Sequence, residues 1–185
     1  NELLVKLTRL DQFRDAWQLP HFSPDEDEPE TEIKGFSFYQ KLDDAELVLR
    51  FFALRHAEHY TKGMRGFLDL YMARARKFEQ KDIEILKTLF TETMDLATQI
   101  YGDLVFHPFD PKKNDWAGKP QKAFYDAVMV GLSGFIDRKE EMIAKKDEII
   151  DETKNLFLKN PQGTFTGRGN TKKDVRDRIE KFKSM

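Results

Sequence analysis

The sequence contains no cysteine, and this absence removes several classes of protein at once. A disulfide-stabilised scaffold, a thiol nucleophile and a zinc or iron–sulfur site with cysteine ligands are all excluded, and the absence fits a reducing cytosol. No apolar run approaches the roughly 20 residues that a membrane-spanning helix needs. The first residues show no signal-peptide pattern. We therefore expect a cytoplasmic protein with no membrane partner.

An excess of one charge is also missing, because 31 Lys and Arg residues nearly balance 33 Asp and Glu residues. The resulting net charge of −2 does not by itself indicate nucleic-acid binding. Glycine and proline are sparse, at 10 and 7 residues, so few positions interrupt regular structure. A chain of 185 residues is long enough to bury one sizeable core but not two.

Apolar residues recur at spacings of three and four along most of the chain, the period of an amphipathic helix. This pattern predicts helices over residues 2–17, 43–60, 64–78, 83–101, 120–135, 138–159 and 172–183. Asp43 and Glu46 have the spacing of a capping box, Gly63 is a good terminator, and Gly35–Tyr39 is the only candidate strand. We predict an all-α, single-domain bundle of about six or seven helices around a buried central helix, residues 43–60.

Two segments lack helical periodicity. Residues 20–34 hold six acids opposed only by Lys34, and charges at that density repel one another. We prefer a solvated loop there to a mimic of nucleic acid. Residues 103–118 are irregular but aromatic, so we expect them to pack on the core. The chain begins at Asn1 and reads as helix at once, so we also expect an upstream part of the protein to be missing.

Two pairs of residues have the spacing of a site. Glu46 and Arg50 are four residues apart on the most apolar helix, and we interpret them as a structural ion pair rather than a ligand site. His56 and His59 lie one helical turn apart, the spacing of two metal ligands, but no third ligand is evident. Surface histidines are therefore preferred. No catalytic triad, paired carboxylates or phosphate loop stands out, so we predict no catalytic residue, no metal and no cofactor in this chain.

The basic residues concentrate at the carboxy-terminal end. From residue 164 onward, seven basic residues face three acids, and a capping box at Thr171 and Asp174 opens the last helix. A helix start can hold a phosphate through its free backbone N–H groups and its dipole. The candidate nucleic-acid-binding residues are Arg168, Lys172, Lys173 and Arg176. A merely solvated basic helix is the alternative.

Several segments of the chain are similar to one large prokaryotic family. The similar segments are Asp44–Leu54, Tyr60–Gly63, Phe67–Met72, Ala123–Val130 and Thr166–Ile179. They resemble segments of the ParB/sulfiredoxin-like nuclease-domain family. In chain order, these are its acid-Glu-Leu-Val-Leu-Arg-Phe helix, its Tyr-Lys-Gly turn, its Phe-Leu-x-x-Tyr/Phe-Met helix, a later helix and its closing segment. That family occurs in Gmr-type modification-dependent restriction enzymes and other phage-defence proteins. The resemblance covers about residues 1–183, is most specific over 44–72, and makes 20–34 look like an insertion.

The resemblance implies a helical lobe without catalysis of its own. Family members carry an Asp-Gly-Gln-Gln-Arg signature in an amino-terminal α/β lobe linked to nucleotide hydrolysis and nuclease action, and this chain lacks that signature. A His-Asn-His-type nuclease domain is also absent, and only Glu46 and Arg50 match a recurring family position. The implied partner is the missing ParB-like lobe, with DNA and a homo-oligomer as further candidate partners. Three hypotheses follow: a scaffold lobe of a DNA-targeting defence protein, a direct DNA-binding module and, third, an independent enzyme.

Overall fold

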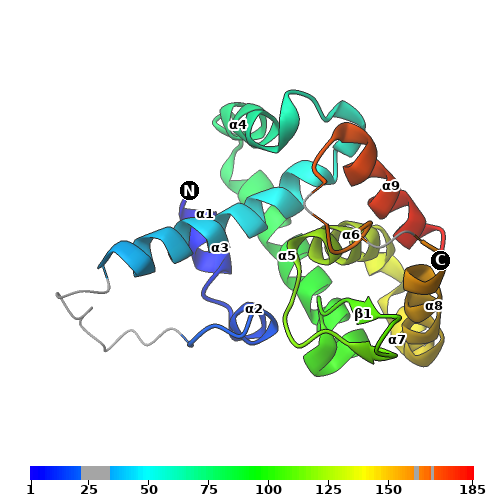
Figure 1. Cartoon of the computed structure of the whole chain (residues 1–185). Helices are drawn as coiled ribbons and strands as arrows, with labels where there is room; N and C mark the ends of the chain where they lie inside the picture. Colours follow the sequence, from blue (N-terminus) through cyan, green and yellow to red (C-terminus); the bar gives the residue numbers. More distant parts are fainter. Residues whose placement is uncertain (22–33, 161–162, 168) are drawn as a thin grey trace.

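The computed structural model describes residues 1–21, 34–160, 163–167 and 169–185, and it confirms the all-α class (Figure 1). The α-helices are α1 (Glu2–Leu7), α2 (Asp11–Ala16), α3 (Lys34–Leu54), α4 (Gly63–Ala75), α5 (Gln80–Tyr101), α6 (Lys122–Leu132), α7 (Lys139–Ala144), α8 (Lys146–Lys159) and α9 (Lys172–Lys183). Three 3₁₀ turns, η1 (Ala57–His59), η2 (Gly102–Leu104) and η3 (Ser133–Arg138), connect them. Within the described residues, none of the helices is both long and apolar enough to cross a bilayer.

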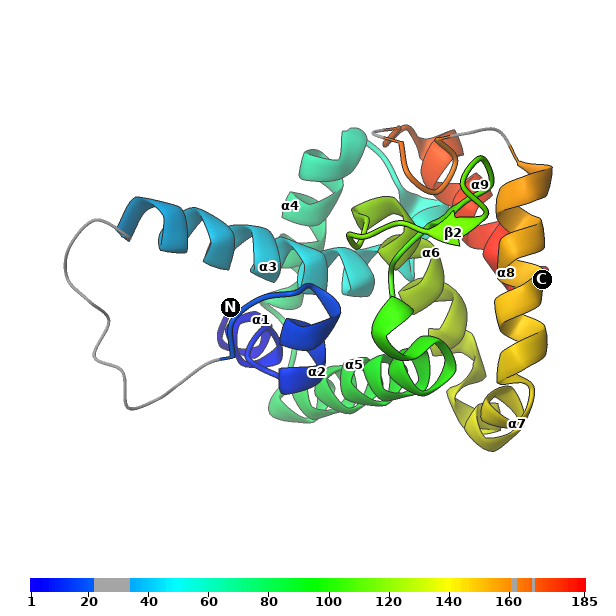
Figure 2. The same ribbon diagram turned by 60° about the horizontal axis from the view of Figure 1, so that its bottom comes forward.

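Helix α6, rather than the predicted helix 43–60, lies at the centre of the bundle, and every residue from Ala123 to Leu132 is buried. Helices α3, α5 and α9 pack around it, as Figures 1 and 2 show from two directions. The second half of α3 is also buried, as its almost continuous apolar sequence predicts. Because these helices come from distant parts of the chain, their contacts bring residues near 50, 126 and 178 together.

The packing of α9 on α6 depends on Gly131. A Cβ atom on that glycine would lie 2.3 Å from Cδ1 of Phe182, far closer than packed atoms approach. Glycine therefore lets the Phe182 ring lie directly on the backbone of α6.

The helix predicted over residues 43–60 has different ends in the structure. It begins at Lys34, so Asp43 lies inside α3 and caps nothing; its carboxylate lies 3.8 Å from Lys122 Nζ instead. The candidate strand Gly35–Tyr39 is helical for the same reason. At the other end, α3 stops at Leu54, and Gly63 begins α4 instead of ending the preceding helix. Lys62 and Gly63 have positive φ of 60° and 71°, and this left-handed reversal sets the direction of α4.

Two of the predicted helices are each divided in two. Residues 2–17 form α1 and α2 because Leu10 is extended, with φ −62° and ψ 131°. The stretch 138–159 is divided at Lys145 into α7 and α8. In both cases the apolar stripe continues across the break, so the sequence pattern predicts helix but not the bend.

The aromatic segment 103–118 packs on the core as predicted, with Phe106 and Phe109 buried. It also forms a small antiparallel hairpin that the sequence did not predict, β1 (Phe109–Asp110) with β2 (Asp115–Trp116), in which Phe109 pairs with Trp116. Most of the acidic loop predicted for 20–34 lies outside the described residues.

Candidate functional site

A buried ion pair joins α3 to α6. Arg50 Nε donates to Asp126 Oδ1 at 3.0 Å, and Arg50 Nη2 donates to Oδ2 of the same carboxylate. Both residues are almost completely buried, at 3% and 0% exposure. A two-bonded guanidinium–carboxylate pair is the strongest way to satisfy a charge inside a core.

A second buried arginine, Arg178 of α9, completes this cluster. Its Nη1 lies 3.6 Å from Asp126 Oδ2, its Nε donates to the carbonyl of Asp174 at 3.2 Å, and its Nη2 donates to the carbonyl of Gly169. Helices α3, α6 and α9 are thus joined at one carboxylate. We call Arg50, Asp126 and Arg178 the charge cluster.

The two arginines are not equally compensated. Burial disfavours the charged form of Arg50, but the charge and hydrogen bonds of Asp126 outweigh burial and raise the pKa of Arg50. Burial lowers the pKa of Arg178, Asp126 offsets this only in part, and the positive charge of Arg50 adds to the lowering. Asp126 therefore acts mainly as the counter-ion of Arg50, while Arg178 depends on backbone carbonyls.

The predicted Glu46–Arg50 pair exists but is secondary. Arg50 Nη1 lies 3.7 Å from Glu46 Oε1, and the Glu46 side chain is 41% exposed whereas that of Arg50 is 4% exposed. The sequence-based interpretation missed Asp126 as the main partner. The signal was present, because Asp126 is the one acid within the apolar run Phe124–Val130.

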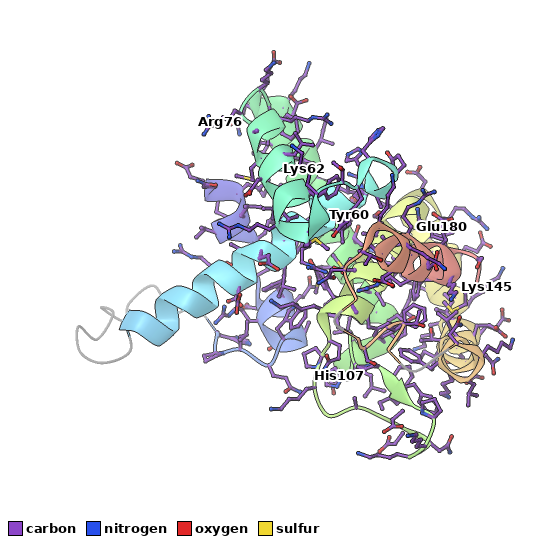
Figure 3. All side chains as sticks on the ribbon, turned by 45° about the horizontal axis from the view of Figure 1, so that its top comes forward. Tyr60, Lys62, Arg76, His107, Lys145 and Glu180 are labelled. Carbon is purple, nitrogen blue, oxygen red and sulfur yellow. The ribbon has the colours of Figure 1, made fainter. Side chains whose placement is uncertain are left out.

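A hydrogen bond connects the start of α4 to the start of α9. Tyr60 Oη donates to the carbonyl of Asn170 at 2.5 Å, and burial raises the pKa of this phenol, which keeps it protonated. Beside this bond is an open hollow of about 660 Å³. Figure 3 labels Tyr60 and Lys62, two of the residues that line it. The hollow is lined by His59, Tyr60, Thr61, Lys62, Gly63, Asn170, Thr171 and Lys172.

Both helices that border the hollow begin there. The capping box predicted at Thr171 and Asp174 is confirmed, with Asp174 N donating to Thr171 Oγ1 at 3.2 Å and Thr171 N donating to Asp174 Oδ2 at 3.0 Å. The hydrogen bonds that the Thr171 hydroxyl and backbone N–H donate to the Asp174 carboxylate lower the pKa of Asp174. The N-cap of α4, Lys62, makes no such side-chain bond. The partial positive charge of two helix starts therefore adds to the charge of nearby lysines.

Three of the four predicted nucleic-acid-binding residues are exposed at this end of α9. Lys172 lines the hollow, and Lys173 and Arg176 follow it on the first turns of the helix. Arg168 lies outside the described residues. Arg178, which the sequence counts with the basic residues, is buried in the charge cluster. Its position on the same face as Val175 and Phe182 was the signal of burial.

Lys62 joins these residues from the other side of the hollow. We call Lys62, Lys172, Lys173 and Arg176 the basic surface. All four are exposed, and no ion pair joins any of them to an acid in the described part of the chain. Asp174, the nearest acid on α9, is occupied by the capping box. The four cations are therefore available to an external anion.

The two histidines considered as metal ligands lie on the surface. Their side chains are 54% and 66% exposed, and both approach Glu58. Across residues 1–21, 34–160, 163–167 and 169–185, no three His, Asp or Glu side chains are grouped in a way that could hold a metal ion.

Comparisons of this chain with family models, curated proteins and solved structures find no match. What the chain does is therefore inferred from its own residues and their geometry.

Proposed function

We propose that this chain binds the phosphate backbone of DNA through the basic surface. The observation that carries this proposal is a set of four exposed cations from two distant segments, near the starts of two helices, that form no ion pair with any acid among the described residues. Lys and Arg contacts to phosphates supply most of the affinity of sequence-independent DNA binding. With about four contacts, binding is weak, independent of sequence and strongly salt-dependent.

Charge reversal tests this proposal, and the chain offers a matched control. Lys172 and Lys173 are the first two residues of α9, while Lys145 and Lys146 are adjacent exposed lysines at the start of α8. Lys145 lies well away from Lys62 (Figure 3). The binding of a fluorescent duplex is measured by anisotropy near 0.1 M salt for both double variants, K172E/K173E and K145E/K146E.

We expect K172E/K173E to weaken binding by about tenfold or more and K145E/K146E to change it much less. Equal weakening by both variants would mean that net charge rather than the basic surface governs binding. If K172E/K173E binds the duplex as tightly as the unaltered chain does, the proposal is wrong.

A second candidate function is that of a scaffold. We propose that the chain forms the helical, non-catalytic lobe of a DNA-targeting defence protein of the ParB/sulfiredoxin-like nuclease-domain family, working with an amino-terminal lobe. In support, each residue of the charge cluster lies in a segment that carries the resemblance: Arg50 in 44–54, Asp126 in 123–130 and Arg178 in 166–179. A fourth such segment, 60–63, begins with Tyr60. The shared segments thus supply the residues that hold α3, α6 and α9 together.

The scaffold candidate predicts that the purified chain has no turnover when given Mg²⁺, nucleotide and duplex DNA. Hydrolysis or nicking that follows the protein through size exclusion, and is lost on a point substitution in this chain, would contradict it.

A further inference from the structure

The Tyr60 side chain lines the hollow. Its ring is buried against Phe67, with ring centroids 5.0 Å apart, and its hydroxyl reaches the carbonyl of Asn170. Tyr60 is two residues before Lys62, and Asn170 is two residues before Lys172. A hydrogen bond therefore joins the two halves of the basic surface, beside the packing of η1 on α9.

The hydrogen bonds within the start of α9 are local to that segment, and Arg178 also connects it to Asp126 of α6. Arg178 fixes the carbonyls of Gly169 and Asp174, and Thr171 caps the helix with Asp174. A Cβ atom on Gly169 would lie 2.9 Å from atoms of the Asp174 side chain, so this turn is tightly folded on itself. Among the described residues, the bond from Tyr60 alone joins residues 57–63 to residues 169–173 through hydrogen bonding.

We infer that Tyr60 is a positioning residue for phosphate binding, an inference that rests on the proposed DNA-binding function. It holds Lys62 and Lys172 at a fixed separation, so that both act on the same stretch of the phosphate backbone. A surface that is already ordered loses little conformational entropy when it binds its ligand, so its affinity is higher. Without the hydroxyl, the packing of η1 on α9 and the Arg178 contacts remain, but Lys62 and Lys172 are less tightly positioned before DNA binds.

The test uses Tyr60→Phe, which removes the hydroxyl and keeps the ring on Phe67. Tyr101→Phe is the matched control, because Tyr101 is equally buried and its hydroxyl bonds Thr153 at 2.8 Å, among residues that do not line the hollow. Both variants lose one hydrogen bond, partly buried in Tyr60→Phe and buried in Tyr101→Phe. We expect Tyr60→Phe to bind the fluorescent duplex about 3- to 10-fold more weakly, and Tyr101→Phe to bind it as the unaltered chain does.

A second readout separates positioning from stability. Lys62→Gln and Lys172→Gln are combined in the unaltered chain and in Tyr60→Phe. In the unaltered chain we expect the two losses of affinity to be coupled, so that the double variant loses less than the product of the single losses. In the Tyr60→Phe background we expect the two substitutions to act independently, so that the loss of affinity in the double variant equals the product of the single losses. Amide hydrogen exchange of Asp174 and Val175, faster in Tyr60→Phe than in Tyr101→Phe, reports the loosened helix start in the folded protein.

The outcomes distinguish this inference from the function on which it rests. If the unaltered chain does not bind the duplex, the proposed function is wrong and the inference is wrong with it. If the unaltered chain binds but Tyr60→Phe matches Tyr101→Phe in affinity, coupling and exchange, only the inference is overturned.

Discussion

Arg50 and Asp126 lie 76 residues apart in the chain and form a two-bonded ion pair at the centre of the fold. Arg178 approaches the same carboxylate from α9, so the segment that carries most of the basic surface is attached to the core through buried charge. The position of the exposed lysines thus depends on groups that do not themselves reach the solvent.

Asp126→Asn tests how much stability depends on this carboxylate. The amide keeps the volume but leaves Arg178 without a counter-ion and Arg50 with only the partly exposed Glu46, and a buried pair that loses one partner costs about 3–5 kcal/mol. We expect that loss in the free energy of unfolding measured with urea. Asp43→Asn is the control, because Asp43 is exposed, lies 3.8 Å from Lys122 and should cost about 1 kcal/mol or less. Similar small losses for both variants would show that the charge cluster does not stabilise the fold.

Two substitutions of Arg50 separate the contribution of its charge to stability from that of its apolar side-chain stem. Arg50→Met and Arg50→Ala both leave Asp126 with Arg178 as its remaining cation, but methionine keeps apolar volume in the core. We expect Arg50→Met to be more stable than Arg50→Ala by about 2 kcal/mol in urea unfolding. Glu46→Gln should cost about 1 kcal/mol or less, since Glu46 is partly exposed. A Glu46→Gln loss as large as that of Arg50→Met would return Glu46 to the position of main partner.

Gly131→Ala probes the packing of α9 on α6. The added methyl group would overlap the Phe182 ring, so the helices must separate or the ring must move, at a cost of about 1–3 kcal/mol. The better helix propensity of alanine offsets up to about 1 kcal/mol of that. In Gly134→Ala, the control, the Cβ atom meets nothing within 4 Å. The urea midpoint should fall for Gly131→Ala and stay level or rise for Gly134→Ala; the reverse order would contradict the close packing.

Alkaline pH should destabilise the protein through its buried tyrosines. Burial raises the pKa of Tyr101 and of Tyr125 above the ordinary value near 10. Above pH 10 the unfolded chain releases these protons while the folded chain keeps them, so stability is full below about pH 10 and falls as pH rises further. The slope reaches about 1.4 kcal/mol per pH unit for each tyrosine.

Urea unfolding between pH 9 and 11 measures this decline, and Tyr101→Phe should reduce its slope. An unchanged slope in that variant would mean that other groups cause the alkaline loss.

The helical stripes allowed much of this fold to be predicted, because α4, α5 and α9 each bury one face and repeat apolar residues at the helical period. The ends of α3 were wrong because local signals were ambiguous: Asp43 has the spacing of a cap but lies inside the helix. Gly63 is as suited to opening a left-handed turn as to ending a helix. Local sequence preferences do not determine which of these uses prevails.

The site was only partly predictable for a different reason. Lys172, Lys173 and Arg176 belong to one local motif, a capped basic helix, and could be identified together. Lys62 and Tyr60 are contributed by a segment 110 residues earlier, and their position beside α9 depends on tertiary packing. The Asp126 partner of Arg50 is likewise a tertiary contact, although a lone acid in an apolar helix was its signal.

The salt dependence of duplex binding tests the central claim most directly. If Lys62, Lys172, Lys173 and Arg176 contact phosphates, log K for the unaltered chain should fall against log salt with a slope of about −3 to −4. The slope should flatten in K172E/K173E while the circular dichroism spectrum stays the same, because neither lysine is buried. A slope near zero, or no binding even at low ionic strength, would contradict DNA binding by the basic surface.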